Sequence, residues 1–95
     1  MLKEPEINII VQKVASANLA SDSIVSVNNS PTVDSVGDPA LRIRITVTPV
    51  STAAISGDAA LRTLHEVHRL LQEQGEDRFP IIEYATPAEA ERAGS

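Results

Sequence analysis

The chain has 95 residues, a formal net charge of −5 at pH 7 and no cysteine. This length supports one domain, 1–95, with a single core. An acidic surface repels phosphate backbones and anionic lipid, so we expect neither nucleic acid nor a membrane surface as a partner. Without cysteine there is no disulfide framework and no thiolate metal site. Residues 1–6 do not have the features of a secretory signal, and the cytoplasm is the expected location.

An amphipathic helix is predicted for residues 5–20, because four apolar residues recur at the spacing of one helix face. These are Ile7, Ile10, Val11 and Val14. Pro5 suits the first helical position, where its missing N–H would be unpaired in any case. Several of the residues in 6–12 are β-branched, so a strand there is the alternative.

Two strands are predicted next, separated by a polar loop. Residues 24–28 form a short strand candidate, and residues 28–39 are rich in turn-forming Asn, Ser, Pro, Gly and Asp. Within this loop Asp34 and Asp38 are interpreted as turn formers. Residues 41–48 then alternate strictly between apolar and polar side chains, which predicts a strand with one buried face.

A second helix is predicted from about Ser56 or Gly57 to Gln74, after a loop over 49–57 that contains the apolar run 53–55. Ser56 can cap its start and Gly75 can end it. Its buried stripe is expected to consist of Ala60, Leu61, Leu64, Val67 and Leu71.

The C-terminal part of the sequence predicts a last strand over 79–85, with Pro80 at its start. Residues 86–89 (Thr-Pro-Ala-Glu) match a capping box with proline at the first helical position. Residues 86–95 are therefore expected to form a short terminal helix or a frayed tail.

Together these elements predict an α+β fold with the order α-β-β-α-β, in which two helices pack on one face of a small mixed sheet. The opposite face of this two-layer sandwich would be polar. It is expected to carry Ser26, Arg42, Arg44, Thr46, Thr48 and Glu83.

Two arginines on this polar face are the first candidate site. Arg42 and Arg44 could hold a carboxylate or phosphate with their forked guanidinium groups, and Arg78 could join them near the strand end. The simpler interpretation is a solvated face on which Glu83 is a cross-strand partner.

His65 and His68 are the candidate metal ligands. One turn apart on the second helix, they could share a divalent ion with a carboxylate from elsewhere. The simpler interpretation is a surface histidine next to a histidine at the edge of the core.

An exposed sheet edge is the third candidate. The strand over 41–48 is long and regular, and natural proteins rarely leave such an edge bare. Leu70 lies off the predicted helix stripe and Ile9 lies opposite Ile7, so both are expected to be exposed. These features predict self-association, most simply as a homodimer.

The sequence carries no catalytic triad, phosphate-binding loop or dinucleotide fingerprint, so we expect a non-enzymatic protein-interaction or assembly module that needs no cofactor. It would act by sheet-edge or helix-face pairing, with Arg42 and Arg44 as specificity contacts. The alternative is a small ligand- or metal-sensing domain that uses His65 and His68 or the arginine face.

Overall fold

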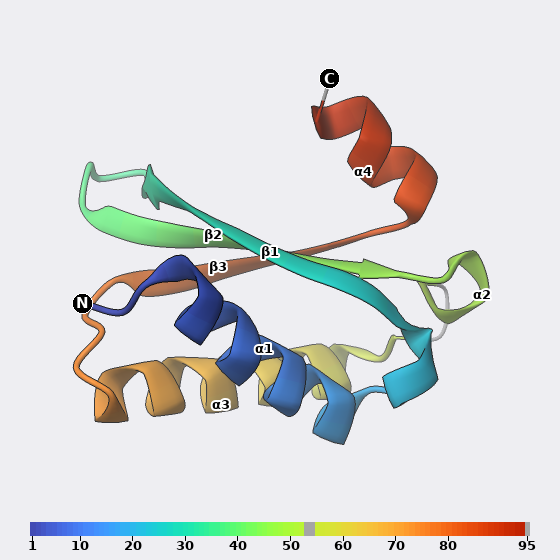
Figure 1. Cartoon of the computed structure of the whole chain (residues 1–95), viewed down its shortest axis with the longest axis horizontal. Coiled ribbons are helices and arrows are strands. Elements are labelled where there is room, and N and C mark those ends of the chain that lie inside the picture. Colours follow the sequence, from blue (N-terminus) through green and yellow to red (C-terminus); the bar gives the residue numbers. More distant parts are fainter. Residues whose placement is uncertain (53–54, 95) are drawn as a thin grey trace.

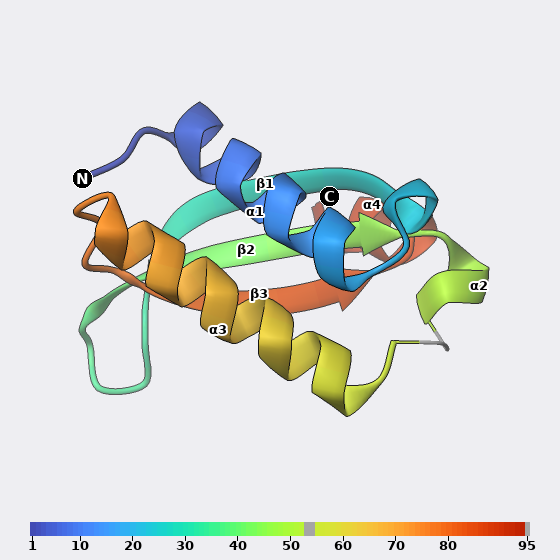
Figure 2. The same cartoon turned by 90° about the horizontal axis from the view of Figure 1, so that it is seen from below.

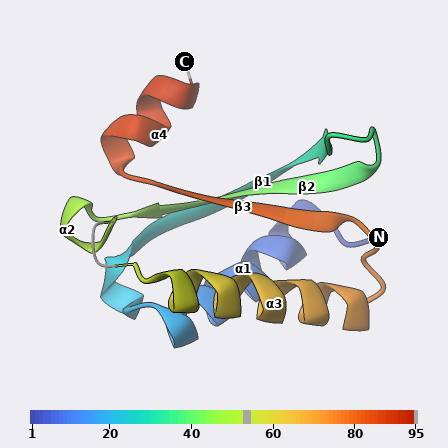
Figure 3. The same cartoon turned by 180° about the vertical axis from the view of Figure 1, so that it is seen from behind.

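A computed structural model describes residues 1–52 and 55–94 of the chain. It has the predicted α+β fold, with element order α-β-β-α-β and a three-stranded mixed sheet (Figure 1). Helices α1 (Glu4–Asn18) and α3 (Gly57–Glu73) lie on one face of the sheet, and the short helix α4 (Pro87–Gly94) lies on the other (Figure 3). Of the predicted apolar run 53–55, residues 53 and 54 lie outside the described part of the chain.

Helix α1 confirms the helical interpretation of the N-terminal region and excludes the strand alternative. Pro5 lies in its first turn, and the Lys3 backbone N–H donates to Glu6 Oε1 at 3.1 Å. Four residues of α1 are buried against the sheet and α3: Ile7, Val11, Val14 and Ala15. β-branched residues are tolerated in this helix because burial of its apolar face outweighs their weak helix propensity.

Strand β1 (Ile24–Val33) follows a 3₁₀ turn at Ser21–Ser23 and is twice as long as the sequence predicts. The prediction of a polar loop over 28–39 is wrong, since only 34–38 separates β1 from β2. Asp34 Oδ1 accepts from the backbone N–H groups of Val36 and Asp38, and Gly37 adopts a φ of +88°. Two of the five polar residues of β1, Asn28 and Ser30, are exposed, and the buried Asn29 is hydrogen-bonded to α1.

Strand β2 (Pro39–Val47) is the centre of the sheet. It pairs with β1 antiparallel and with β3 (Phe79–Ala85) parallel. The prediction of an exposed edge at 41–48 is therefore wrong, because both sides of this strand are hydrogen-bonded. Its alternation is confirmed: one set of side chains is at most 1% exposed and faces the helices, namely Leu41, Ile43, Ile45 and Val47.

The chain between β2 and β3 contains a short helical turn, α2 (Pro49–Thr52), where a loop was predicted, and then α3. Both predicted ends of α3 are confirmed. Ser56 Oγ accepts from the Ala59 backbone N–H at 3.0 Å, and Gly75 ends the helix region with a φ of +84°.

Helix α4 confirms the predicted capping box. The Thr86 N–H donates to Glu89 Oε1 and the Glu89 N–H donates to Thr86 Oγ1. The helix contacts β2 and β3 from the polar side of the sheet. Thr46, which was predicted to be exposed on that side, is only 3% exposed.

Candidate functional site

The free edge of β3 lies beside an apolar hollow. β3 pairs with β2 on one side and with no described strand on the other. Seen from the helix side, α3 crosses β3, and the first half of α3 extends beyond this edge of the sheet (Figure 2). A hollow of about 460 Å³ lies between the helix and the strand.

The buried face of α3 is rotated relative to the stripe that the sequence predicts. Its buried residues occur at every fourth position: Ala59, Thr63, Val67 and Leu71. Thr63 is tolerated in the core because its hydroxyl donates to the Ala59 carbonyl oxygen at 2.8 Å. Leu61 is therefore 52% exposed, and its predicted place in the core is wrong.

This rotation leaves α3 with a second apolar flank next to β3. Nine residues line the hollow and none of them is charged: Gly57, Ala60, Leu61, Leu64, Phe79, Pro80, Ile81, Ile82 and Tyr84. Phe79 and Ile81 are 46% and 39% exposed, and the Phe79 ring meets His68 edge-on with ring centroids 4.8 Å apart. We call these nine residues the β3 groove. A lining of this kind can accommodate apolar side chains.

Tyr84 carries the one polar side-chain group among the nine residues. Its oxygen is buried and has no hydrogen bond of good geometry to the described residues. Burial raises the pKa of Tyr84, which the nearby Thr63 hydroxyl partly opposes. The phenol is consequently neutral at physiological pH, and the groove carries no charge.

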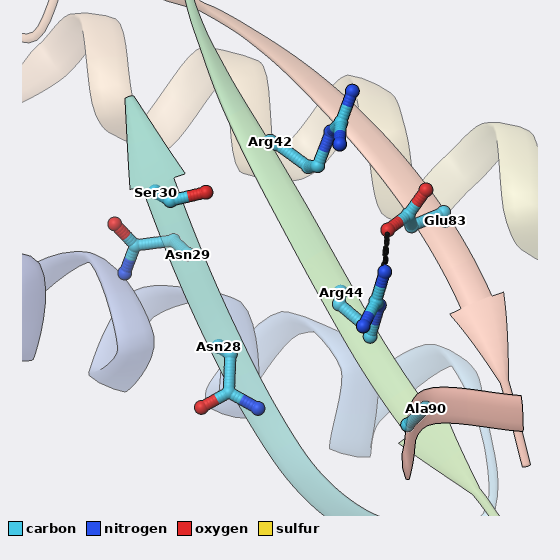
Figure 4. Close-up of a pocket in the computed structure, with 7 residues that line it drawn as sticks. All are labelled: Asn28, Asn29, Ser30, Arg42, Arg44, Glu83 and Ala90. Atoms are coloured by element: carbon cyan, nitrogen blue, oxygen red, sulfur yellow. Dashed lines mark hydrogen bonds and ion pairs between the residues drawn. The ribbon is translucent and has the colours of Figure 1, made fainter. Parts of the chain in front are cut away.

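The polar face of the sheet carries the predicted arginine site (Figure 4). Arg44 is paired with Glu83, with 2.8 Å between Arg44 Nη2 and Glu83 Oε1, so the predicted cross-strand partner is present. The Arg42 side chain is exposed and makes no hydrogen bond or ion pair with the described residues. A polar hollow of about 410 Å³ lies here, and its lining includes these three side chains, Asn28 and Ser30. The site thus offers one unpaired guanidinium group where the sequence suggested two.

Arg78 belongs to a different part of the molecule. Its side chain forms two hydrogen bonds of 2.9 Å with the carboxylate of Glu76, which is 1% exposed. The Leu2 backbone N–H also donates to this carboxylate. The Arg78 guanidinium holds the pKa of Glu76 at about 2, well below the usual 4.5. Arg78 therefore anchors the start of β3 and is not part of the arginine face.

The two histidines do not form a complete metal site by themselves. His65 is exposed, and His68 is half-buried against Phe79. Within residues 1–52 and 55–94, no group of three His, Cys, Asp or Glu side chains is placed to hold a metal ion. A metal bound by His65 and His68 would need a ligand from solvent or from another molecule.

Sequence reasoning missed the β3 groove, although one signal was present. Residues 59–61 are three consecutive apolar positions at the start of α3. Three consecutive positions span about 200° of a helix, which is wider than one face, since successive residues are 100° apart. The excess apolar width indicated that α3 has more than one apolar contact surface.

Comparison with known proteins adds no relative: no family model, curated protein or solved structure matches this chain. No helix in the described part of the chain has both the length and the apolar character that crossing a bilayer requires.

Proposed function

We propose that this protein is a non-enzymatic protein-interaction module whose docking surface is the β3 groove. One observation carries this proposal: an uncharged apolar groove runs along an unpaired sheet edge. Apolar side chains next to free backbone groups favour a polypeptide as the partner, because only a polypeptide satisfies both at once.

The composition of the groove also supports binding over catalysis. Eight of its nine residues offer no side-chain acid, base or nucleophile, and the ninth, Tyr84, is a neutral phenol with a buried oxygen. Charged residues make up 22% of the sequence, so a lining without any of them is a distinct region of the surface. We place this activity in the cytoplasm, in keeping with a chain that has no cysteine.

Self-association through the helix face is the second form of the same function. Ile9 is 68% exposed and lines a hollow between α1 and α3 together with Leu2, Ile10 and Leu70. A homodimer that buries this surface would leave the β3 groove open.

Capture from the native cell tests the proposal. Tagged wild-type protein, Leu61→Asp and Val50→Asp are compared, and the captured proteins are quantified by mass spectrometry. Val50 is the matched control, because it is 85% exposed and lies outside the β3 groove. Partners should be lost with Leu61→Asp and retained with Val50→Asp; an unchanged set of partners with Leu61→Asp would refute the proposal.

A second candidate function rests on Arg42. An exposed guanidinium group without a partner in the described chain, at the edge of a polar hollow, can bind a small carboxylate or phosphate. Titration with inorganic phosphate, followed by amide chemical shifts, should perturb β2 around Arg42 and do so less in Arg42→Gln. Equal shifts in both proteins would exclude this candidate.

A further inference from the structure

We propose that the β3 groove binds an extended apolar segment of a partner protein, which pairs with the free edge of β3 as a fourth strand. This inference rests on the proposed function and specifies the conformation and chemistry of the partner.

The arrangement of α3 and β3 leaves space for one more strand. Neighbouring strands lie about 4.8 Å apart, and a packed layer lies about 10 Å from a sheet. Because the first half of α3 extends beyond β3 (Figure 2), a strand added at this edge would lie beneath that half of the helix. Such a strand would bury Leu61 and Leu64, because its side chains would contact them from the sheet side of α3.

The lining of the groove determines which residues the segment would carry. Alternate side chains of a strand point to opposite faces, so every second residue of the segment would face α3. These residues would be apolar, because the groove offers no charged side chain as a partner. The intervening residues would lie on the polar side of the sheet, where Glu83 is the nearest charged residue of β3.

A second copy of this chain fits the same edge poorly. If two β3 strands paired about a two-fold axis, each would bring its own α3, which crosses β3 and extends beyond its free edge (Figure 2). The two helices would then be separated by about one strand spacing, roughly 5 Å, whereas packed helices need about 8–10 Å. A segment that carries no helix avoids this clash.

Peptide selection tests the inference directly. Random dodecapeptides displayed on phage are selected on the full chain, and a selected peptide is titrated into isotope-labelled protein. We expect apolar residues at alternate positions and cross-peaks between the peptide backbone and the backbone of β3. N-methylation of a peptide amide that faces β3 should weaken binding about tenfold, and methylation of its neighbour should have no effect.

Variants locate the binding surface. Leu61→Asp and Leu64→Asp should each abolish binding of the selected peptide, because both side chains line the groove from α3. Val50→Asp on α2 and Val33→Asp at the opposite sheet edge are controls that should bind normally, because these two side chains are 85% and 63% exposed and lie outside the β3 groove. Circular dichroism of each variant verifies that the fold is retained.

The outcomes separate this inference from the proposed function. Peptides that bind the groove with apolar residues at helical spacing would overturn strand pairing and leave the docking groove in place. Sedimentation equilibrium could instead show a wild-type dimer that Leu61→Asp dissociates. This result would overturn pairing with a partner segment and would make a second copy of the chain the occupant of the groove. If selected peptides bind elsewhere and Leu61→Asp also leaves cellular capture unchanged, both proposals fail.

Discussion

Each edge of the sheet is flanked by a helix, but the residues that line the two edges differ in polarity and charge. At each edge a helix and the edge strand enclose a hollow, formed by α1 and β1 on one side and by α3 and β3 on the other. The β1 hollow is lined by two apolar residues, Ile9 and Val27, and by four polar or charged ones: Asn8, Gln12, Lys13 and Ser16. The β3 groove is uncharged and apolar. The lining of the β1 hollow includes the charged Lys13, whereas the β3 groove has no charged residue, so we expect an apolar partner at the β3 edge.

The β1 edge also has features that discourage further pairing. Its register with β2 shifts between Ile24 and Ser26, which leaves Val25 as the extra residue of a bulge. Pro31 lies further along the strand and has no N–H to donate. Bulges and prolines are the usual means by which proteins protect an edge strand. On β3, Pro80 alone plays this part, at the second residue of the strand.

At each edge of the sheet, one buried polar side chain forms hydrogen bonds that hold the edge strand in place. Removing the side chain that holds β3 should lower the free energy of unfolding most. Glu76→Ala leaves Arg78 without its carboxylate and should lower the free energy of unfolding by about 3 kcal/mol. Urea denaturation measures this loss. Glu91→Ala, an exposed glutamate on α4, is the control and should change stability little. If Glu76→Ala lowers the unfolding free energy by less than the loss of an exposed ion pair would, the pair of Glu76 and Arg78 does not stabilise the fold.

Protonation of the Glu76 carboxylate should make the stability of the protein depend on pH. The folded-state pKa of Glu76 is about 2, below the usual 4.5, so its contribution is fully present above pH 4.5 and is lost as the pH falls towards 2. Glu76→Gln lacks this titration. The difference in unfolding free energy between wild type and Glu76→Gln should therefore shrink steadily over that range in denaturation experiments, and a constant difference would contradict the assignment.

The attachment of β1 should be weaker by comparison. The buried Asn29 amide donates to the Glu4 carbonyl oxygen at 3.0 Å and to Asn8 Oδ1 at 2.7 Å, which fastens β1 to α1. Asn29→Ala removes both bonds and should cost about 2 kcal/mol in urea denaturation. Asn28→Ala, on the exposed face of the same strand, is the matched control and should be nearly neutral. Equal effects of the two substitutions would argue against this attachment.

The smallest expected change in unfolding free energy is for a substitution of Leu61, and it tests whether this residue belongs to the β3 groove or to the core. Leu61→Lys should change the unfolding free energy by no more than about 0.5 kcal/mol, because this side chain is 52% exposed. Val67→Ala, on the buried face of the same helix, should cost about 2 kcal/mol. Thermal melts of both variants provide the test. A large loss in Leu61→Lys would place this residue in the core, as the sequence alone suggested.

The sequence by itself determined the type and order of α1, α3 and the three strands and the alternation of β2, because these depend on local periodicity. It also indicated the cap at Ser56, the capping box of Thr86 and Glu89, and the cross-strand partner of Arg44. Each of these features needs only neighbouring residues or a simple register.

Tertiary structure alone decided the rest. Where β1 ends depends on its pairing with β2, since the polar residues of 28–33 have no strand periodicity that could be read locally. Which face of α3 is buried depends on where α1 and the sheet meet it, and this contact rotated Leu61 out of the core. A sheet edge arises only when strands are assembled, and the β3 groove depends on contacts between residues far apart in the chain.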